Sequence, residues 1–377
     1  MKNFYIYLFF FSVVSTSIKA QTANDTAELE PGWWKIPKTE TRFKVGGYVK
    51  FDLIHDFDPI ASPDFFDVSK IPTDNSEGES THMLAKESRI NLDFRVPTKI
   101  GELKAFIEGD FYGTSSVFRL RHAYIEIRGW LAGQTWSNFM DENIIPNTLD
   151  FEKPSAYAFA RHAMLRYKFT ISKNSYFSLA IEEPSALAQI PSQPGTFESP
   201  LPDLTARYRF SKEWVHIQLS GFIAKLRYRY TAGGKDDLAL YGFNLSGQVN
   251  FSKNDKFIYQ GLIGPGLGRM RGGLSAGLDE TGKLKALDDH GFTLGLQHDW
   301  SPSLFSCAVY NQGAVDNTAG QAVNSLHKLN YVAVDLQWKF IKNALTGIEY
   351  LHGTREDNDN STGKANRIQF SVKYAFN

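Results

Sequence analysis

Residues 87–96 read ESRINLDFRV and alternate ionic or amide residues with mainly apolar ones. Glu87, Arg89, Asn91, Asp93 and Arg95 fall on one side of the alternation, and Ile90, Leu92, Phe94 and Val96 fall on the other. Successive side chains of a β-strand point to opposite faces, so the segment predicts a strand with one wet face and one apolar face. A row of charges is costly in a packed core. The pattern is typical of a wall between water and hydrocarbon, a transmembrane β-barrel.

The same period of two recurs along the chain from Phe43 onward. We expect strands near residues 43–53, 87–96, 102–111, 118–128, 132–138, 161–170, 175–182, 203–210, 214–226, 238–251, 256–264, 290–300, 303–311, 329–340, 344–355 and 364–376. These make an even number, about 16, as bacterial outer-membrane barrels require. The predicted fold class is therefore all-β, an antiparallel up-and-down transmembrane barrel.

The connections between these segments alternate in length. Short turns are expected at 97–101, 129–131, 170–174, 211–213, 252–255, 301–302 and 341–343. Longer loops are expected at 57–85, 139–160, 183–202, 265–289 and 312–328. Outer-membrane barrels have short periplasmic turns and long extracellular loops, so both termini are predicted to be periplasmic.

Aromatic residues gather at the predicted periplasmic strand ends. They are Phe210, Trp214, Phe251, Phe257, Trp300, Phe305, Trp338, Phe340 and Phe376. Aromatic rings favour the boundary between membrane and water, so this set predicts half of an aromatic girdle.

The N-terminus predicts export and three parts to the chain. Lys2, an apolar run at 6–14 and Ala20 resemble a signal peptide over residues 1–20, and the run is too short to span a membrane as a helix. Residues 21–42 are polar and predict a short periplasmic segment before a barrel at 43–377. The predicted location is the Gram-negative outer membrane. A formal net charge of zero gives no basic field for nucleic acid, so no such partner is expected.

Several stretches together resemble the DcaP-like family of outer-membrane porins. They are Ile36–Thr41 followed by Val45–Asp52, then Leu120–Glu126, Ala132–Phe139 and Ile145–Phe151. The resemblance covers about residues 36–170 and implies a homotrimer of 16-stranded barrels through which small anions such as dicarboxylates diffuse. Outer-membrane lipid and lipopolysaccharide would surround it.

Charged residues at inward positions predict how such a channel selects solutes. A 16-stranded barrel is wide enough for an aqueous pore, and loop 139–160 is expected to fold into it. The predicted pore-lining basic residues are Lys50, Arg89, Arg95, Arg119, Arg121, Arg161, Arg166, Arg207 and Arg209, with His122 beside them. The loop supplies Asp141, Glu142 and Asp150. Charges facing one another across a pore orient ions, and the arginine fork suits carboxylates. The alternative is that these arginines pair with wall carboxylates such as Glu108 and only stabilise the wall.

Arg119 and Arg121 fall on the outward phase of their strand. A β-bulge near Arg121 would turn both side chains into the lumen. The sequence thus predicts a bulge at this position.

The sequence also bears on functions other than that of a porin. An outer-membrane phospholipase would need a nucleophile and a base on the lipid-facing rim, where the outward positions are almost entirely apolar. An adhesin or phage receptor built on the loops is compatible with a porin. Residues 277–284 depart from the phosphate-binding loop at Leu284, and residues 357–361 lack the glycine of a calcium loop. No enzyme activity, cofactor or metal is expected.

Overall fold

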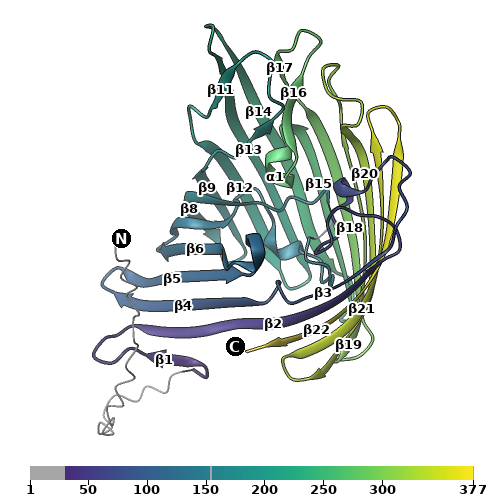
Figure 1. Cartoon of the computed structure of the whole chain (residues 1–377). Coiled ribbons are helices and arrows are strands. Elements are labelled where there is room, and N and C mark those ends of the chain that lie inside the picture. The colour runs from purple at the N-terminus through teal and green to yellow at the C-terminus, as the bar shows by residue number, and fades with distance from the viewer. Residues whose placement is uncertain (1–29, 153–154, 377) are drawn as a thin grey trace, which may run out of the picture.

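A computed structural model describes residues 30–152 and 155–376 and shows a closed barrel (Figure 1). Sixteen long antiparallel strands form the wall, which confirms the predicted fold class. The last strand, β22 (Thr362–Ala375), pairs with the first long strand, β2 (Arg42–Asp56), so the sheet leaves no open edge. The signal peptide predicted for residues 1–20 lies outside the described residues.

The other long strands match the predicted segments to within a few residues. They are β4 (Arg89–Thr98), β5 (Gly101–Asp110), β6 (Arg119–Ile127), β7 (Trp130–Trp136), β8 (Arg161–Ser172), β9 (Ser175–Glu182), β12 (Asp203–Lys212), β13 (Val215–Tyr230), β14 (Lys235–Asn250), β15 (Asp255–Pro265), β18 (Asp288–Asp299), β19 (Leu304–Val315), β20 (Leu326–Ile341) and β21 (Ala344–Asp357).

The wall and the loops also contain shorter elements. They are β1 (Trp33–Lys35), β3 (Ser80–Leu84), β10 (Leu187–Ala188), β11 (Gly195–Glu198), β16 (Leu274–Leu278), β17 (Leu284–Ala286), the helix α1 (Gly268–Arg271) and the 3-10 turns η1 (Val68–Lys70), η2 (Thr114–Ser116) and η3 (Glu142–Ile144). The strand β1 pairs with the start of β2, so the polar segment before the barrel ends in a small hairpin. Among the described residues, no helix combines the length and hydropathy needed to cross a membrane.

Side-chain exposure follows the alternation that the sequence predicts. In β13, Ile217, Leu219 and Ile223 are exposed, whereas Gln218 and Ser220 between them are buried against the loops inside. Exposed apolar side chains on the outside and polar side chains on the inside are the reverse of a soluble protein. The outer surface of the wall is therefore suited to lipid.

The predicted bulge in β6 is present. Glu108 pairs with His122 and Gly109 with Leu120, so Arg121 is the extra residue in the ladder. Its guanidinium contacts Glu108 at 3.1 Å and Asp110 at 2.9 Å, and Arg119 contacts Asp110 at 2.8 Å. The extra residue re-aims the side chains, which brings both arginines to the lumen side.

The aromatic girdle is largely as predicted, with one correction. Trp214, Phe251, Trp300 and Trp338 are exposed at the periplasmic strand ends. Phe305 is buried, because it shares the inward phase of β19 with Cys307 and Val309. Its ring faces the lumen rather than lipid, so assigning it to the girdle was wrong.

Three long loops fold into the barrel, whereas the sequence predicted one. Loop 137–160 and the segment from Leu267 to Leu284 share an apolar core with wall residues of β13 and β14. Phe66, Val68 and Ile71 of the first loop form a second core with β19 and β20. The remaining open space is therefore set by the loops as much as by the diameter of the barrel.

Candidate functional site

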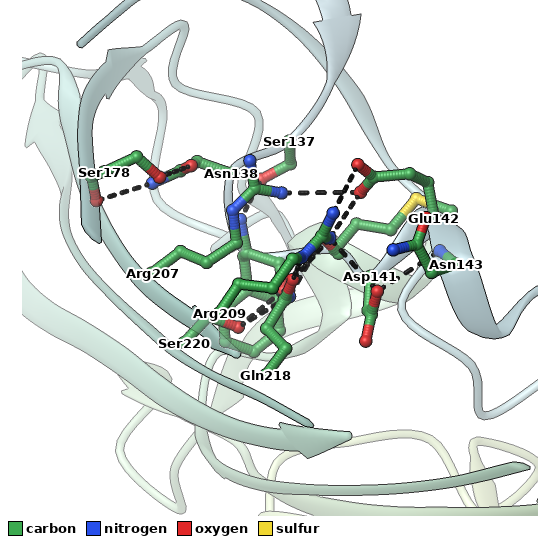
Figure 2. Close-up of polar contacts among 12 residues, drawn as sticks. Ser137, Asn138, Asp141, Glu142, Asn143, Ser178, Arg207, Arg209, Gln218 and Ser220 are labelled. Atoms are coloured by element: carbon green, nitrogen blue, oxygen red, sulfur yellow. Dashed lines mark hydrogen bonds and ion pairs between the residues drawn. The ribbon is translucent and has the colours of Figure 1, made fainter. Parts of the chain in front are cut away.

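Loop 137–160 is held against the wall by an ionic cluster around Asp141 (Figure 2). The Asp141 carboxylate is fully buried and accepts contacts from Arg209 at 3.1 Å, His216 at 2.9 Å and Ser246 at 2.8 Å. Glu142 lies beside it and binds Arg209 at 2.9 Å and Arg207 at 3.4 Å. Four wall side chains thus converge on two adjacent loop carboxylates. These arginines and carboxylates neutralise one another, so this part of the loop presents little free negative charge.

Wall amides and carboxylates hold the remainder of the loop through its backbone. The Glu349 carboxylate accepts a hydrogen bond from the backbone N–H of Asp150 at 2.6 Å. In the same way, the side-chain oxygens of Asn311 and Gln260 accept hydrogen bonds from the backbone N–H groups of Ala156, at 2.8 Å, and Ala158, at 3.1 Å. A loop buried in a barrel needs such partners, because unpaired backbone groups are costly away from water. The inward polar face of the strands therefore fixes the path of the loop.

A cavity of about 400 Å³ lies between loop residues 145–151 and the wall. Its charged lining residues are Lys50, Glu87, Arg89, Arg121, Lys339 and Lys373. Its aromatic lining residues are Tyr48, Trp136, Phe151, Phe159 and Phe305. Among the charged residues that line the cavity, five are cations and one is a carboxylate.

Two of these cations are held by carboxylates. Lys50 is buried and binds Glu87 as well as Asp52, the latter at 3.2 Å. Arg121 is 1% exposed and is bound between Glu108 and Asp110. Their charge is largely compensated, so their main contribution is to the shape and rigidity of the wall.

The other three cations stand over aromatic rings. Lys373 lies 4.0 Å and Arg89 lies 5.3 Å from the centre of the Tyr48 ring, and Lys339 lies 5.1 Å from that of Phe305. The nearest carboxylate of Arg89 is Glu108, at 3.8 Å. An aromatic face attracts a cation through its electron-rich ring.

The predicted site residues divide into those near the cavity and those away from it. Lys50, Arg89 and Arg121 line it. Arg161 stacks over the cavity residue Trp136 at 4.6 Å, and His122 contacts the same ring edge-on at 5.2 Å. Arg119 stands 5.8 Å from the centre of the ring of the cavity residue Phe151, and Asp150 accepts a hydrogen bond from the backbone N–H of Phe66 at 3.0 Å. The ionic cluster that holds loop 137–160, which we call the loop anchor, contains the other four: Arg207, Arg209, Asp141 and Glu142.

Two predicted residues lie outside this arrangement. Arg95 binds Asp93 at 2.7 Å and Glu102 at 3.2 Å, next to the periplasmic turn between β4 and β5. Arg166 lies on the inward phase of β8, but the cavity lining does not include it. Neither side chain therefore lies with Arg89 at the cavity.

Lys339 and Lys373 are cavity residues that the sequence reasoning missed. Both have the inward phase of their strands, since Gln337 and Ser371 two residues earlier are buried on the lumen side. The period of two could have identified them. What it could not show is that β20 and β22 approach the same loop.

Glu152, which follows Phe151 in the loop, has an unusual carboxyl group. Burial, followed by the charges of Asp67 and Asp150, raises its pKa to about 8, although Arg119 and Arg161 oppose the shift. At neutral pH this carboxyl is therefore mostly uncharged. The uncharged carboxyl group therefore offsets little of the positive charge of Arg119 and Arg161.

Within residues 30–152 and 155–376, no group of three or more His, Cys, Asp and Glu side chains is arranged to hold a metal ion.

A closed barrel with an apolar outside, a polar lumen and loops folded inward defines the class of protein as an outer-membrane channel. The model of the DcaP outer membrane protein family matches residues 24–376, so the chain belongs to this family of the Gram-negative outer membrane. The matched region includes the barrel and confirms the resemblance seen in the sequence. No curated protein matches the chain.

Solved structures share the fold. The outer membrane channel DcaP of Acinetobacter baumannii has a TM-score of 0.81 at 22% identity and covers 91% of this chain and 99% of its own. An anion-selective porin from Comamonas acidovorans has a TM-score of 0.63 at 12% identity, with coverage of 89% and 100%. A trimer form of OmpT from Vibrio cholerae has a TM-score of 0.56 at 10% identity, with coverage of 89% and 99%.

Proposed function

We propose that this channel is a passive diffusion porin that prefers small anions, dicarboxylates among them. The observation that carries the proposal is the cavity beside loop residues 145–151, lined by five cations and one carboxylate. A surplus of one charge in a narrow water-filled passage raises the local concentration of the opposite ion. Arg89, Lys339 and Lys373 are the proposed contacts for a passing carboxylate, because each lines the cavity and stands over an aromatic ring.

The anion preference also has support from the loop anchor. Asp141 and Glu142 are paired with Arg207, Arg209 and His216, so the acidic loop does not offset the cations of the cavity. The competing hypothesis, that the arginines only stabilise the wall, fits Arg121 and Arg209; Arg89 differs from them in that it stands over the ring of Tyr48, with Glu108 at 3.8 Å.

We further propose that the protein works as a homotrimer among outer-membrane lipid and lipopolysaccharide, and that it catalyses no reaction. The trimer form of a porin of the same fold supports the first part. The apolar outward side chains, such as Leu219 and Ile223, suit lipid rather than the nucleophile and base of a lipase.

Recording single channels of the purified protein in a planar bilayer tests the proposed function. We expect conductance in steps of three, and a reversal potential in a salt gradient that corresponds to anion preference. A cation-selective value would refute the role of the cavity cations, and lipase activity without conductance would refute the porin itself.

The anion preference is expected to fall as the pH rises through about 8. Glu152 is protonated below its raised pKa and gains a negative charge above it, which offsets Arg119 and Arg161. Reversal potentials measured at about pH 7 and about pH 9 check this, since other carboxyl groups of ordinary pKa are already ionised over that interval. Glu152→Gln is the control and should show a constant, strong anion preference. An identical pH dependence in the variant would assign the effect to another group.

A further inference from the structure

A group of charged residues lies on the outer surface of the barrel near the extracellular end of β13 and β14. Lys225, Arg227 and Arg229 continue the outward phase of Ile217, Leu219 and Ile223, because Leu226 and Tyr228 between them are buried in the core inside the barrel. Lys235 pairs with Arg229 across the β13–β14 hairpin, which rises to the top of Figure 1. We call Lys225, Arg227, Arg229 and Lys235 the basic rim patch.

The basic rim patch carries more positive charge than its carboxylates neutralise. Asp237 is shared by Arg227 at 2.6 Å, Lys225 at 3.4 Å and Lys235 at 3.5 Å. Glu198 of β11 binds Arg229 at 2.6 Å and lies 3.7 Å from Arg227. Four cations and two carboxylates leave two positive charges.

Three of the four cations of the patch are open to other anions, whereas the side chain of Arg227 is 16% exposed. The side chains of Arg229 and Lys235 are 52% and 47% exposed, and that of Lys225 is 37% exposed. Exposed ion pairs contribute little free energy, since water screens them. A ligand with several negative charges can therefore bind the patch without breaking a costly buried contact.

The height of the patch matches the headgroup layer of the outer leaflet. The rung of Ile223 and Tyr241 is the last outward pair in β13 and β14 with two large apolar or aromatic side chains. Lys225 and Arg227 lie about 7 Å and about 13 Å farther along the strand, which is about 5 to 10 Å in height for a tilted strand. The headgroup layer of one leaflet is roughly 5 to 8 Å thick. The cations thus lie level with the phosphates of the surrounding lipid.

Another part of the extracellular rim provides a contrast. Outward Lys328 of β20 is aligned one-to-one with Glu356 of β21. This pair carries no net charge. The patch also lies about halfway round the barrel from β2 and β22, where the sheet closes.

We propose that the basic rim patch binds the phosphate groups of a phosphorylated outer-leaflet lipid, namely lipid A of lipopolysaccharide. The guanidinium forks of Arg227 and Arg229 bind phosphate oxygens in pairs, and Lys225 and Lys235 add point charges. The acyl chains of the lipid lie along Ile223, Tyr241 and Phe243 below. The proposal rests on the outer-membrane location and gives the proposed lipopolysaccharide partner a defined site.

The test is titration of the full-length protein in detergent with diphosphorylated lipid A, in EDTA, with bound lipid counted by native mass spectrometry. Arg227→Gln combined with Arg229→Gln should weaken binding by about tenfold or more, because each cation near an anionic lipid surface contributes to affinity. Lys328→Gln is the matched control and should bind as the wild type does. Lipid A without its phosphates should bind all proteins weakly. Equal binding by wild type and the double variant, or equal binding of the dephosphorylated lipid, would overturn the proposal.

Asp237→Asn separates a lipid site from a purely structural ion-pair network. Removing this carboxylate frees the charge of Lys225, Arg227 and Lys235, so lipid A should bind more tightly. Unchanged or weaker binding would overturn the proposal, since the surplus positive charge of the patch would then not set the affinity. Heat-modified mobility in gels verifies that each variant is folded. Conductance in planar bilayers is recorded in parallel, so a failure of the porin function is distinguished from a failure of the lipid site.

Discussion

Replacing Arg89, Lys339 and Lys373 together with glutamate should convert the channel from anion preference to cation preference. The three side chains line one cavity, whose charged residues are five cations and one carboxylate. After the exchange two cations and four carboxylates remain among those residues. A unit charge about 4 Å from a passing ion is worth about 1 kcal/mol even at the dielectric constant of water. Six units of change should therefore alter the ratio of anion to cation permeability by at least roughly tenfold.

The measurement is the reversal potential in a salt gradient, whose sign should invert. A matched control exchanges three exposed lysines of periplasmic turns, Lys99, Lys253 and Lys342, for glutamate. The control alters the net charge of the protein equally but leaves the cavity unchanged, so it should retain the anion preference. If the cavity variant keeps the wild-type sign, selectivity arises elsewhere in the lumen.

Replacing Arg209 with alanine should release loop 137–160 from the wall. Arg209 is the cation that contacts both Asp141 and Glu142, at 3.1 and 2.9 Å. Removing one partner of a buried ion pair typically costs about 3–5 kcal/mol, because the other charge stays buried without compensation. The loop should then detach in part, which widens the lumen. We expect larger and noisier single-channel conductance, and a lower temperature of heat modification.

Two further variants make this result interpretable. Asp141→Asn added to Arg209→Ala should recover part of the stability, since the uncompensated carboxylate is then removed. Arg42→Ala breaks an exposed pair with Glu102 near the periplasmic rim, and such pairs contribute about 0–1 kcal/mol. A conductance change in Arg42→Ala as large as that in Arg209→Ala would show that the effect is not specific to the loop anchor.

The wall of the barrel could be predicted almost completely from the sequence. Period-two alternation depends on neighbouring residues of one strand, so each strand can be located from its own segment. The break in that alternation at Arg121 was also informative, because the bulge found there re-aims the two arginines as predicted. Phe305 shows the limit of this prediction, because an aromatic residue near a turn looks the same in the sequence whether it faces lipid or the lumen.

The site was only partly predictable, and the loops are the reason. The sequence placed Lys50, Arg89 and Arg121 on the inward face, but it gave no means of deciding that Arg207 and Arg209 bind Asp141 and Glu142. These contacts join residues more than 60 positions apart, at 3.4 and 2.9 Å. The sequence also did not show that two further extracellular loops fold inward, since Phe66 and Met270 stand in segments with no strand period.

The sequence by itself determined the membrane barrel, its strand number, the inward and outward face of nearly every strand, and the side on which the long loops lie. All of these follow from local alternation between two solvents, water and hydrocarbon. The tertiary structure alone decided which inward cations bind loop carboxylates and which line the cavity, because that depends on the path of the folded loops. Arg209 binds Asp141, whereas Arg89 and Lys373 line the cavity beside the ring of Tyr48.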